Sequence, residues 1–190
     1  MDEGLAKIRH ARSQKDFPFL NLKDGEFVEF AFQRAKICLV MIFGGVALGL
    51  ILILLTALVV LAGQTELDTM GRRFLYIILA VLILMAILIG LVALVIYRGN
   101  RLFVTNKRVI QMVMKTPVAT SVNIIDLASV EDASFHQNGI MQKLFHYGTF
   151  RLSTVGDETT YTFEYSDVSP ADLKAVSKLV TDAKKELKKD

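Results

Sequence analysis

Residues 37–62 read ICLVMIFGGVALGLILILLTALVVLA, and this stretch contains no Asp, Glu, Lys, Arg or His. Residues 74–97, FLYIILAVLILMAILIGLVALVIY, form a second stretch without a charged side chain or a histidine. Since an α-helix rises about 1.5 Å per residue, the two stretches would reach roughly 39 and 36 Å, more than the roughly 30 Å of a bilayer's hydrocarbon core. The sequence therefore predicts a transmembrane helical hairpin over residues 37–97, with helices at 37–62 and 74–97 and a loop at 63–73.

The composition of the whole chain supports this interpretation. Of its 190 residues, 53% are hydrophobic, and the mean hydropathy of +0.44 is high for a soluble domain. A buried helix of a soluble protein rarely stays apolar around its whole circumference over this length. A cleaved signal peptide does not fit either, because residues 1–36 are mostly polar and precede the first stretch. We expect both helices to remain in the mature protein.

The distribution of Lys and Arg predicts which way the hairpin faces, because positively charged segments near the span ends are held on the cytoplasmic side. Basic residues flank the outer ends of the two stretches: Lys23, Arg34 and Lys36 before the first, and Arg98, Arg101, Lys107, Arg108 and Lys115 after the second. The loop holds Arg72 and Arg73 beside Glu66 and Asp68, which argues weakly the other way. We expect a multi-pass protein of the plasma (inner) membrane with both termini in the cytoplasm.

Small residues recur at a spacing of four on both predicted helices. Gly45 and Gly49 form one such step, and Ala86 and Gly90 form another. Small side chains allow helix backbones to approach closely inside a membrane. The simplest interpretation is packing between the two helices of the hairpin, and the alternative is self-association of two chains through Gly45 and Gly49. Neither helix contains Pro or a charge at membrane depth, which disfavours a transporter, a proton relay or a pore.

After residue 98 the sequence changes to the short apolar and β-branched runs that are typical of strands. Six strands are predicted, at 102–105, 108–114, 119–125, 128–135, 149–154 and 160–165. Asn106 and Lys107 supply the first tight turn, since Asn tolerates left-handed backbone. Between the fourth and fifth strands, Ile140, Leu144 and Phe145 have helical spacing, so we expect a short helical turn that packs its apolar side inward.

A C-terminal amphipathic helix follows the last strand. The run Ser169-Pro170-Ala171-Asp172 predicts its start, because Ser and Asp can cap each other and Pro suits the first helical position. One stripe of the helix is apolar and consists of Leu173, Val176, Val180, Ala183 and Leu187. We expect this stripe to close one end of a small sheet, and the alternative is a helix that lies on the membrane surface.

Four short motifs occur in a characteristic order and spacing. They are Asp24-Gly25-Glu26, LFVTNKR at 102–108, IIDLASV at 124–130 and LFHYGTFRLST at 144–154. Together they resemble the bacterial pleckstrin-homology-like membrane proteins, over most of residues 24–179. The resemblance implies an α+β membrane protein whose pleckstrin-homology (PH)-like domain consists of two bent antiparallel sheets, closed at one end by the C-terminal helix. That family usually has a glycine where this chain has His146.

The fold implied by the resemblance has seven strands, one more than the six predicted above. In residues 26–32, strand geometry would place Val28, Phe30 and Phe32 on one face, so this stretch supplies an added strand or begins the first span as helix. We divide the chain into a cytoplasmic N-terminal segment (1–36), the transmembrane hairpin (37–97) and a PH-like cytoplasmic domain (98–190).

No constellation of residues predicts catalysis, a cofactor or a metal. His10, His136 and His146 are scattered, and Gly44-Gly45 lies inside a predicted span without a phosphate-binding context. The single cysteine, Cys38, excludes an intrachain disulfide. A basic fringe beside the membrane explains the net charge of +3, so nucleic acid is not an expected partner.

These observations predict a non-enzymatic, membrane-anchored binding or scaffolding module for a protein partner or a second copy of the chain, in contact with membrane lipids. One alternative is a domain that binds anionic lipid, for which the available basic residues are Arg101, Lys107, Arg108, Lys115 and Lys143. Another alternative is an accessory subunit of a membrane enzyme or transporter. The fold does not choose among these functions.

Overall fold

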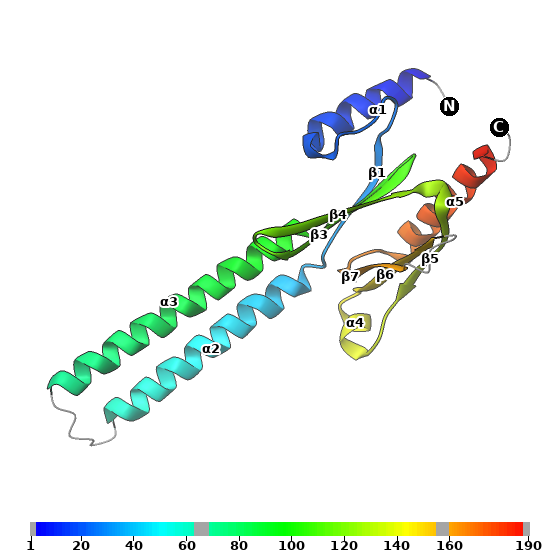
Figure 1. Ribbon diagram of the computed structural model, residues 1–190. Coiled ribbons are helices and arrows are strands. Elements are labelled where there is room, and N and C mark those ends of the chain that lie inside the picture. The colour runs from blue at the N-terminus through cyan, green and yellow to red at the C-terminus, as the bar shows by residue number, and fades with distance from the viewer. Residues whose placement is uncertain (1–2, 63–68, 155–159, 188–190) are drawn as a thin grey trace.

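The computed structural model describes residues 3–62, 69–154 and 160–187, and shows a long helical hairpin that projects from a β-rich domain (Figure 1). The hairpin consists of α2 (Ile37–Ala62) and α3 (Thr69–Gly99). By length and composition, Ile37–Val60 and Met70–Gly99 are able to cross a membrane. Of their most apolar windows, 0% and 6% are buried inside the protein, unlike the core helices of a soluble domain.

The second helix starts earlier than the sequence predicts. It begins at Thr69 rather than at residue 74, so Arg72 and Arg73 lie in its first turns and not in a loop. The predicted loop residues 63–68 lie outside the described residues. Between the helices, a Cβ added to Gly90 would meet Val46 at 3.4 Å, whereas a Cβ added to Gly45 or Gly49 would meet nothing within 4 Å. Of the predicted small residues with these values, Gly90 is the one that faces a side chain of the other helix, and the packing role of all four stays a prediction.

The domain contains two antiparallel sheets, as the PH-like fold requires. The first has the order β1-β2-β3-β4, with β1 (Val28–Gln33), β2 (Arg101–Thr105), β3 (Arg108–Thr116) and β4 (Ala119–Asp126). The second has the order β5-β6-β7, with β5 (Val130–His136), β6 (Gly148–Thr154) and β7 (Thr160–Ser166). A short 3-10 turn, η2 (Leu127–Ser129), connects the sheets. The predicted strands are confirmed, and the stretch left open between strand and helix supplies β1.

The connection between β1 and β2 contains the whole helical hairpin. Gln33 pairs with Arg101 and Ala31 with Phe103, so two strands separated by the α2–α3 hairpin are direct neighbours. The sheet therefore extends beyond the range 98–190, since its first strand precedes α2. In effect, the helical hairpin is inserted into the loop of a β-hairpin.

The main core lies between the two sheets and α5 (Pro170–Leu187), which closes one end of the domain as predicted. Val176 and Val180 of α5 are buried, and Leu173 and Ala183 pack against the same core. The side chain of Leu187, also assigned to this stripe, lies outside the described part. The predicted cap is confirmed, because Ser169 Oγ lies 2.6 Å from Asp172 Oδ2 and accepts from Asp172 N at 3.2 Å.

A smaller core covers the outer face of the first sheet. The chain before β1 folds as α1 (Glu3–Asp16) and the 3-10 turn η1 (Pro18–Leu20), and Leu20 packs on Phe103 and Ile110. Both faces of β2 are therefore covered, which explains why its sequence is continuously apolar. Helix α1 could not be predicted from local pattern, because its residues are mostly polar and lack a marked apolar stripe.

The helical turn between β5 and β6, α4 (Ile140–Leu144), has the opposite orientation to the one predicted. Ile140 and Leu144 are 84% and 63% exposed, and Phe145 is 44% exposed, so the apolar side faces outward. The physical reason is polar anchoring of the other side: Gln142 Oε1 accepts from Asn138 N, and the Gln142 carbonyl accepts from Gln137 Nε2 at 3.2 Å.

Candidate functional site

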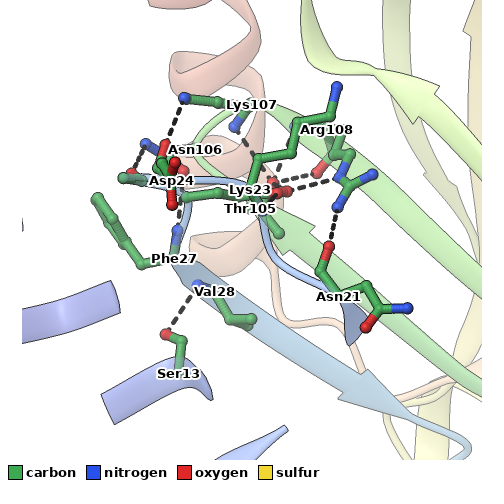
Figure 2. Close-up of polar contacts among 12 residues, drawn as sticks. Ser13, Asn21, Lys23, Asp24, Phe27, Val28, Thr105, Asn106, Lys107 and Arg108 are labelled. Atoms are coloured by element: carbon green, nitrogen blue, oxygen red, sulfur yellow. Dashed lines mark hydrogen bonds and ion pairs between the residues drawn. The ribbon is translucent and has the colours of Figure 1, made fainter. Parts of the chain in front are cut away.

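Two of the motifs in the sequence, far apart along the chain, meet in a buried ion pair. Arg108 Nε lies 2.8 Å from Glu26 Oε1, and the two side chains are 10% and 0% exposed. Thr105 Oγ1 donates to the same carboxylate oxygen at 2.8 Å, and Lys23 N donates to Glu26 Oε2 at 2.8 Å. Figure 2 shows these contacts between the chain before β1 and the turn from β2 to β3. Lys23, Glu26, Thr105, Asn106 and Arg108 are called the polar cluster below.

The environment of Glu26 favours its ionised form. Burial alone would raise the pKa of this carboxyl, but hydrogen bonds from Arg108, Lys23 N and Thr105, together with the charge of Arg108, outweigh it and leave the pKa lowered. Glu26 is therefore a carboxylate at neutral pH. A carboxylate held by three donors is a structural anchor rather than a proton donor for catalysis.

Backbone contacts extend the polar cluster along the same turn. Asn106 Oδ1 accepts from Phe27 N at 3.1 Å, and Asn106 Nδ2 donates to the Gly25 carbonyl at 3.2 Å. Lys107 Nζ donates to the Asp24 carbonyl at 3.0 Å (Figure 2). Gly25 has φ +71, a left-handed conformation that glycine adopts without a Cβ penalty. These contacts join the segment before the hairpin to the segment after it.

The five basic residues that sequence analysis offered for lipid or partner contacts do not converge. Arg108 is buried in the polar cluster. Lys107 lies at the turn that ends β2, roughly 17 Å from the end of α3 at about 3.3 Å per strand residue. Arg101 begins β2 beside α3 and its guanidinium lies 5.9 Å from the ring centroid of Phe19. Lys115 is exposed on β3 of the first sheet, and Lys143 is exposed on α4, the helical turn between two strands of the second sheet.

A groove of about 360 Å³ opens between the two sheets and is called the inter-sheet groove below. It is lined by Gln111, Val113, Lys115, Ser121, Asn123, Thr160, Tyr161 and Thr162. Gln111 Nε2 donates to the Thr162 carbonyl at 2.7 Å, which joins β3 to β7 across its floor. Since amides and hydroxyls dominate the lining, this groove can bind polar or backbone groups by hydrogen bonding.

A second groove, of about 380 Å³, lies between α2 and α3 and is apolar. Gly45 and Gly49 line it on α2 and Ala86 lines it on α3, so three of the four predicted helix-packing residues border open space. In the described part of the chain, no group of three or more His, Cys, Asp or Glu side chains could hold a metal ion.

The family model described as "Bacterial PH domain" matches residues 30–184, which is most of the chain. The chain belongs to the bacterial PH domain family. This confirms the resemblance seen in the four motifs and agrees with the two sheets and the closing helix. The match begins inside β1, so this bacterial PH domain includes the hairpin as an insertion between its first two strands.

One solved structure similar to this bacterial PH domain protein is that of a DUF1696 family protein with a pleckstrin-homology domain from Shewanella loihica PV-4. The two chains are 15% identical, and the alignment covers 45% of this chain and 70% of the other with a TM-score of 0.32. The fold assignment rests on the family match and the strand topology, not on this distant likeness. No curated protein matches the chain significantly.

Sequence reasoning missed the role of Glu26 in the bacterial PH domain. The motif containing Glu26 and the motif containing Arg108 were both noted, but a single sequence gives no signal that residues so far apart are in contact. Two local features of the sequence pointed to these residues. Glu26 directly precedes an alternating apolar run, and Arg108 directly follows the predicted turn at Asn106 and Lys107. Pairing them required the β1–β2 register.

Proposed function

We propose that this protein is a non-enzymatic, membrane-anchored binding module. The α2–α3 hairpin crosses the plasma membrane, both termini lie in the cytoplasm, and the PH-like domain binds a protein partner or a second copy of the chain. The observation that carries this proposal is the pairing of β1 with β2 across the hairpin. Because these strands adjoin the two ends of the hairpin, the domain is held at the membrane surface by its β1–β2 side.

The inter-sheet groove is the site that we assign to such a partner, because its lining offers amide and hydroxyl groups. Its walls are the face of β3 and β4 and the strand β7, and β4 and β7 are the end strands of their sheets in the described topology. An extended segment of a partner can pair with an open strand edge while its side chains enter the groove. Asn123 Nδ2 donates to Gln111 Oε1 at 3.3 Å, so the floor already holds ordered polar groups.

Specific recognition of one lipid headgroup is the alternative function. It would require several basic side chains around one pocket, and the five candidates lie in different parts of the domain. Arg108 is already paired with Glu26. This separation favours the protein-binding proposal, and it leaves anionic lipid as a less specific contact of Lys115 and Lys143. An accessory role in a membrane enzyme or transporter is compatible with the same groove.

The proposal is tested by site-specific photocrosslinking of the full chain in native membranes. A photoreactive amino acid at Ser121, on the wall of the groove, should give a discrete crosslinked product. The matched control is Lys174, which is exposed on α5 away from the groove. We expect no such product from Lys174. Adding Asn123→Ala should reduce the crosslink at Ser121 several-fold, because a hydrogen-bonding group of the groove is removed.

The identity of the product separates the possible functions. A crosslink to another protein or to a second copy supports the binding module. Crosslinks to lipid alone support the lipid-binding alternative, and equal products from Ser121 and Lys174 contradict a role for the groove.

A further inference from the structure

The outward apolar side of α4 is the feature that the proposed function does not use. Its side chains Ile140, Met141, Leu144 and Phe145 are 84%, 58%, 63% and 44% exposed. At about 100° per residue they cover roughly 140° of the helix circumference, which makes one continuous face. Isolated exposed apolar residues need no explanation, but a contiguous group of four marks a contact surface.

This outward orientation is fixed by hydrogen bonds and by the turns on either side of α4. The opposite side of α4 is anchored by Gln142, whose backbone carbonyl accepts from Tyr147 N at 3.1 Å and from Gln137 Nε2 at 3.2 Å. Gly139, before the helix, and His146, after it, both have positive φ, of 97° and 53°. The two turns therefore hold the apolar face outward.

Contacts made by the residues that follow α4 place this helix near the start of α2. The ring of Tyr147 stacks on Tyr165 with 5.9 Å between centroids, and the Tyr165 carbonyl accepts from Ala35 N at 2.6 Å. Ala35 lies two positions before α2, and Tyr97 in the last turns of α3 donates to the Arg34 carbonyl at 2.9 Å. Tyrosines gather at the water interface of membranes because their rings are amphipathic. Figure 1 shows α4 at the end of the second sheet nearest to α2.

The turn between β3 and β4 lies at the same level. Asn100, directly after α3, donates to the Met114 carbonyl at 3.0 Å, and a Cβ added to Gly99 would meet the Met114 side chain. Residues 115–118 extend past this point, so the turn lies beside the last turns of α3 (Figure 1). Val118 at its tip is 95% exposed. An exposed apolar residue separate from the four on α4 therefore lies on the same side of the domain.

We infer that α4 inserts its apolar face into the interfacial zone of the bilayer that holds the hairpin, with the β3–β4 turn as a second contact. This inference rests on the proposed function, because it requires α2 and α3 to be in the membrane. The occupant is lipid rather than protein because the contacts through Tyr147, Tyr165 and Ala35 place α4 near the start of α2, where the proposed membrane surface lies. Lys143 on α4 and Lys115 beside the turn are exposed, and their charges suit anionic headgroups.

Bilayer docking would fix the orientation of the domain at a second point. The hairpin alone attaches the domain at the β1–β2 side, which belongs to the first sheet. The α4 face lies in the connection between β5 and β6 of the second sheet. The hairpin and the α4 face together would therefore restrain the tilting of both sheets relative to the membrane. The inter-sheet groove would then be presented to a partner at a constant height above the membrane.

The test uses an environment-sensitive fluorophore on the full chain, reconstituted in vesicles of neutral and anionic phospholipid. Cys38→Ser removes the native thiol, and single cysteines are placed at Leu144 on α4, Leu54 inside α2 and Lys174 on α5. We expect blue-shifted emission at Leu144 that is quenched by a doxyl group high on the lipid acyl chain. Leu54 should respond to a deep doxyl group, and Lys174 only to aqueous iodide.

The three positions separate the inference from the proposed function. Iodide quenching at Leu144 with lipid quenching at Leu54 would overturn α4 docking and keep the hairpin in the membrane. Iodide quenching at Leu54 would overturn both. A blue shift at Leu144 without lipid quenching would mean that a protein surface covers α4, and would also overturn the inference. In the Ile140→Gln and Met141→Gln double variant, lipid quenching at Leu144 should fall several-fold.

Discussion

At the scale of single residues, the ion pair between Glu26 and Arg108 makes the stability of the domain depend on pH. The pKa of Glu26 is lowered in the folded protein from its ordinary value of 4.5. Its ionised form therefore stabilises the fold at pH values above 4.5, and this contribution is lost as the pH falls through the lowered pKa. We expect the stability of the full chain to decrease in this acid range.

Glu26→Gln tests this dependence. The substitution should lower the free energy of unfolding by about 3 kcal/mol at neutral pH, because Arg108 stays buried without its counter-charge. The acid-induced loss of stability should be smaller in the variant than in the wild type. Denaturant unfolding of the full chain in detergent micelles measures both quantities.

The matched control is Glu29→Gln, which removes the more exposed ion pair with Arg9. It should cost less than about 1 kcal/mol, as surface ion pairs usually do. An acid-induced loss in Glu26→Gln as large as in the wild type would show that other carboxylates cause it.

His146 is a second residue with a definite expectation. Its φ of 53° lies in the left-handed region, which L side chains rarely adopt. A side chain raises the energy of that conformation, so His146→Gly should increase the free energy of unfolding by about 0.5–1 kcal/mol. His146→Ala keeps the Cβ and should give no gain. Equal melting temperatures for the glycine and alanine variants would contradict the conformational explanation.

At the scale of elements, local signals in the sequence predicted most helices and strands. The two apolar stretches, the alternating strands and the cap at Ser169 each depend on residues close together along the chain. The polar helix α1 lacked such a signal, and the orientation of α4 depended on the tertiary anchoring of Gln142. The strand β1 was ambiguous because it leads directly into an apolar span. The polar cluster was not predictable from one sequence, because its contact depends on strand register.

The insertion of the helical hairpin between β1 and β2 leads to a prediction about folding. Since Gln33 and Arg101 are paired, a connection of about four residues should be able to replace residues 36–99. The fused chain should be soluble and folded, with mixed α and β circular dichroism. Residues 98–190 alone lack β1 and Phe32, which is 7% exposed in the core, and should be less stable or aggregate.

A matched variant makes this experiment sharper. In the fused chain, Phe32→Ala should cost about 3–5 kcal/mol, as expected for truncation of a buried aromatic residue. If residues 98–190 fold as stably as the fused chain, β1 does not belong to the cooperative unit. If the fused chain is unfolded, the domain requires the hairpin or the membrane.

At the scale of the whole molecule, the proposed function requires that the hairpin crosses a membrane with both termini on the cytoplasmic side. Cysteine labelling in intact cells tests this directly, in a Cys38→Ser background. One cysteine replaces Gln64, which lies outside the described residues, and the other replaces the exposed Lys178 of α5. We predict that an impermeant maleimide labels Gln64→Cys in intact cells and labels Lys178→Cys only after the membrane is permeabilised. Labelling of Lys178→Cys with protection of Gln64→Cys, or labelling of both in intact cells, would contradict the proposed topology.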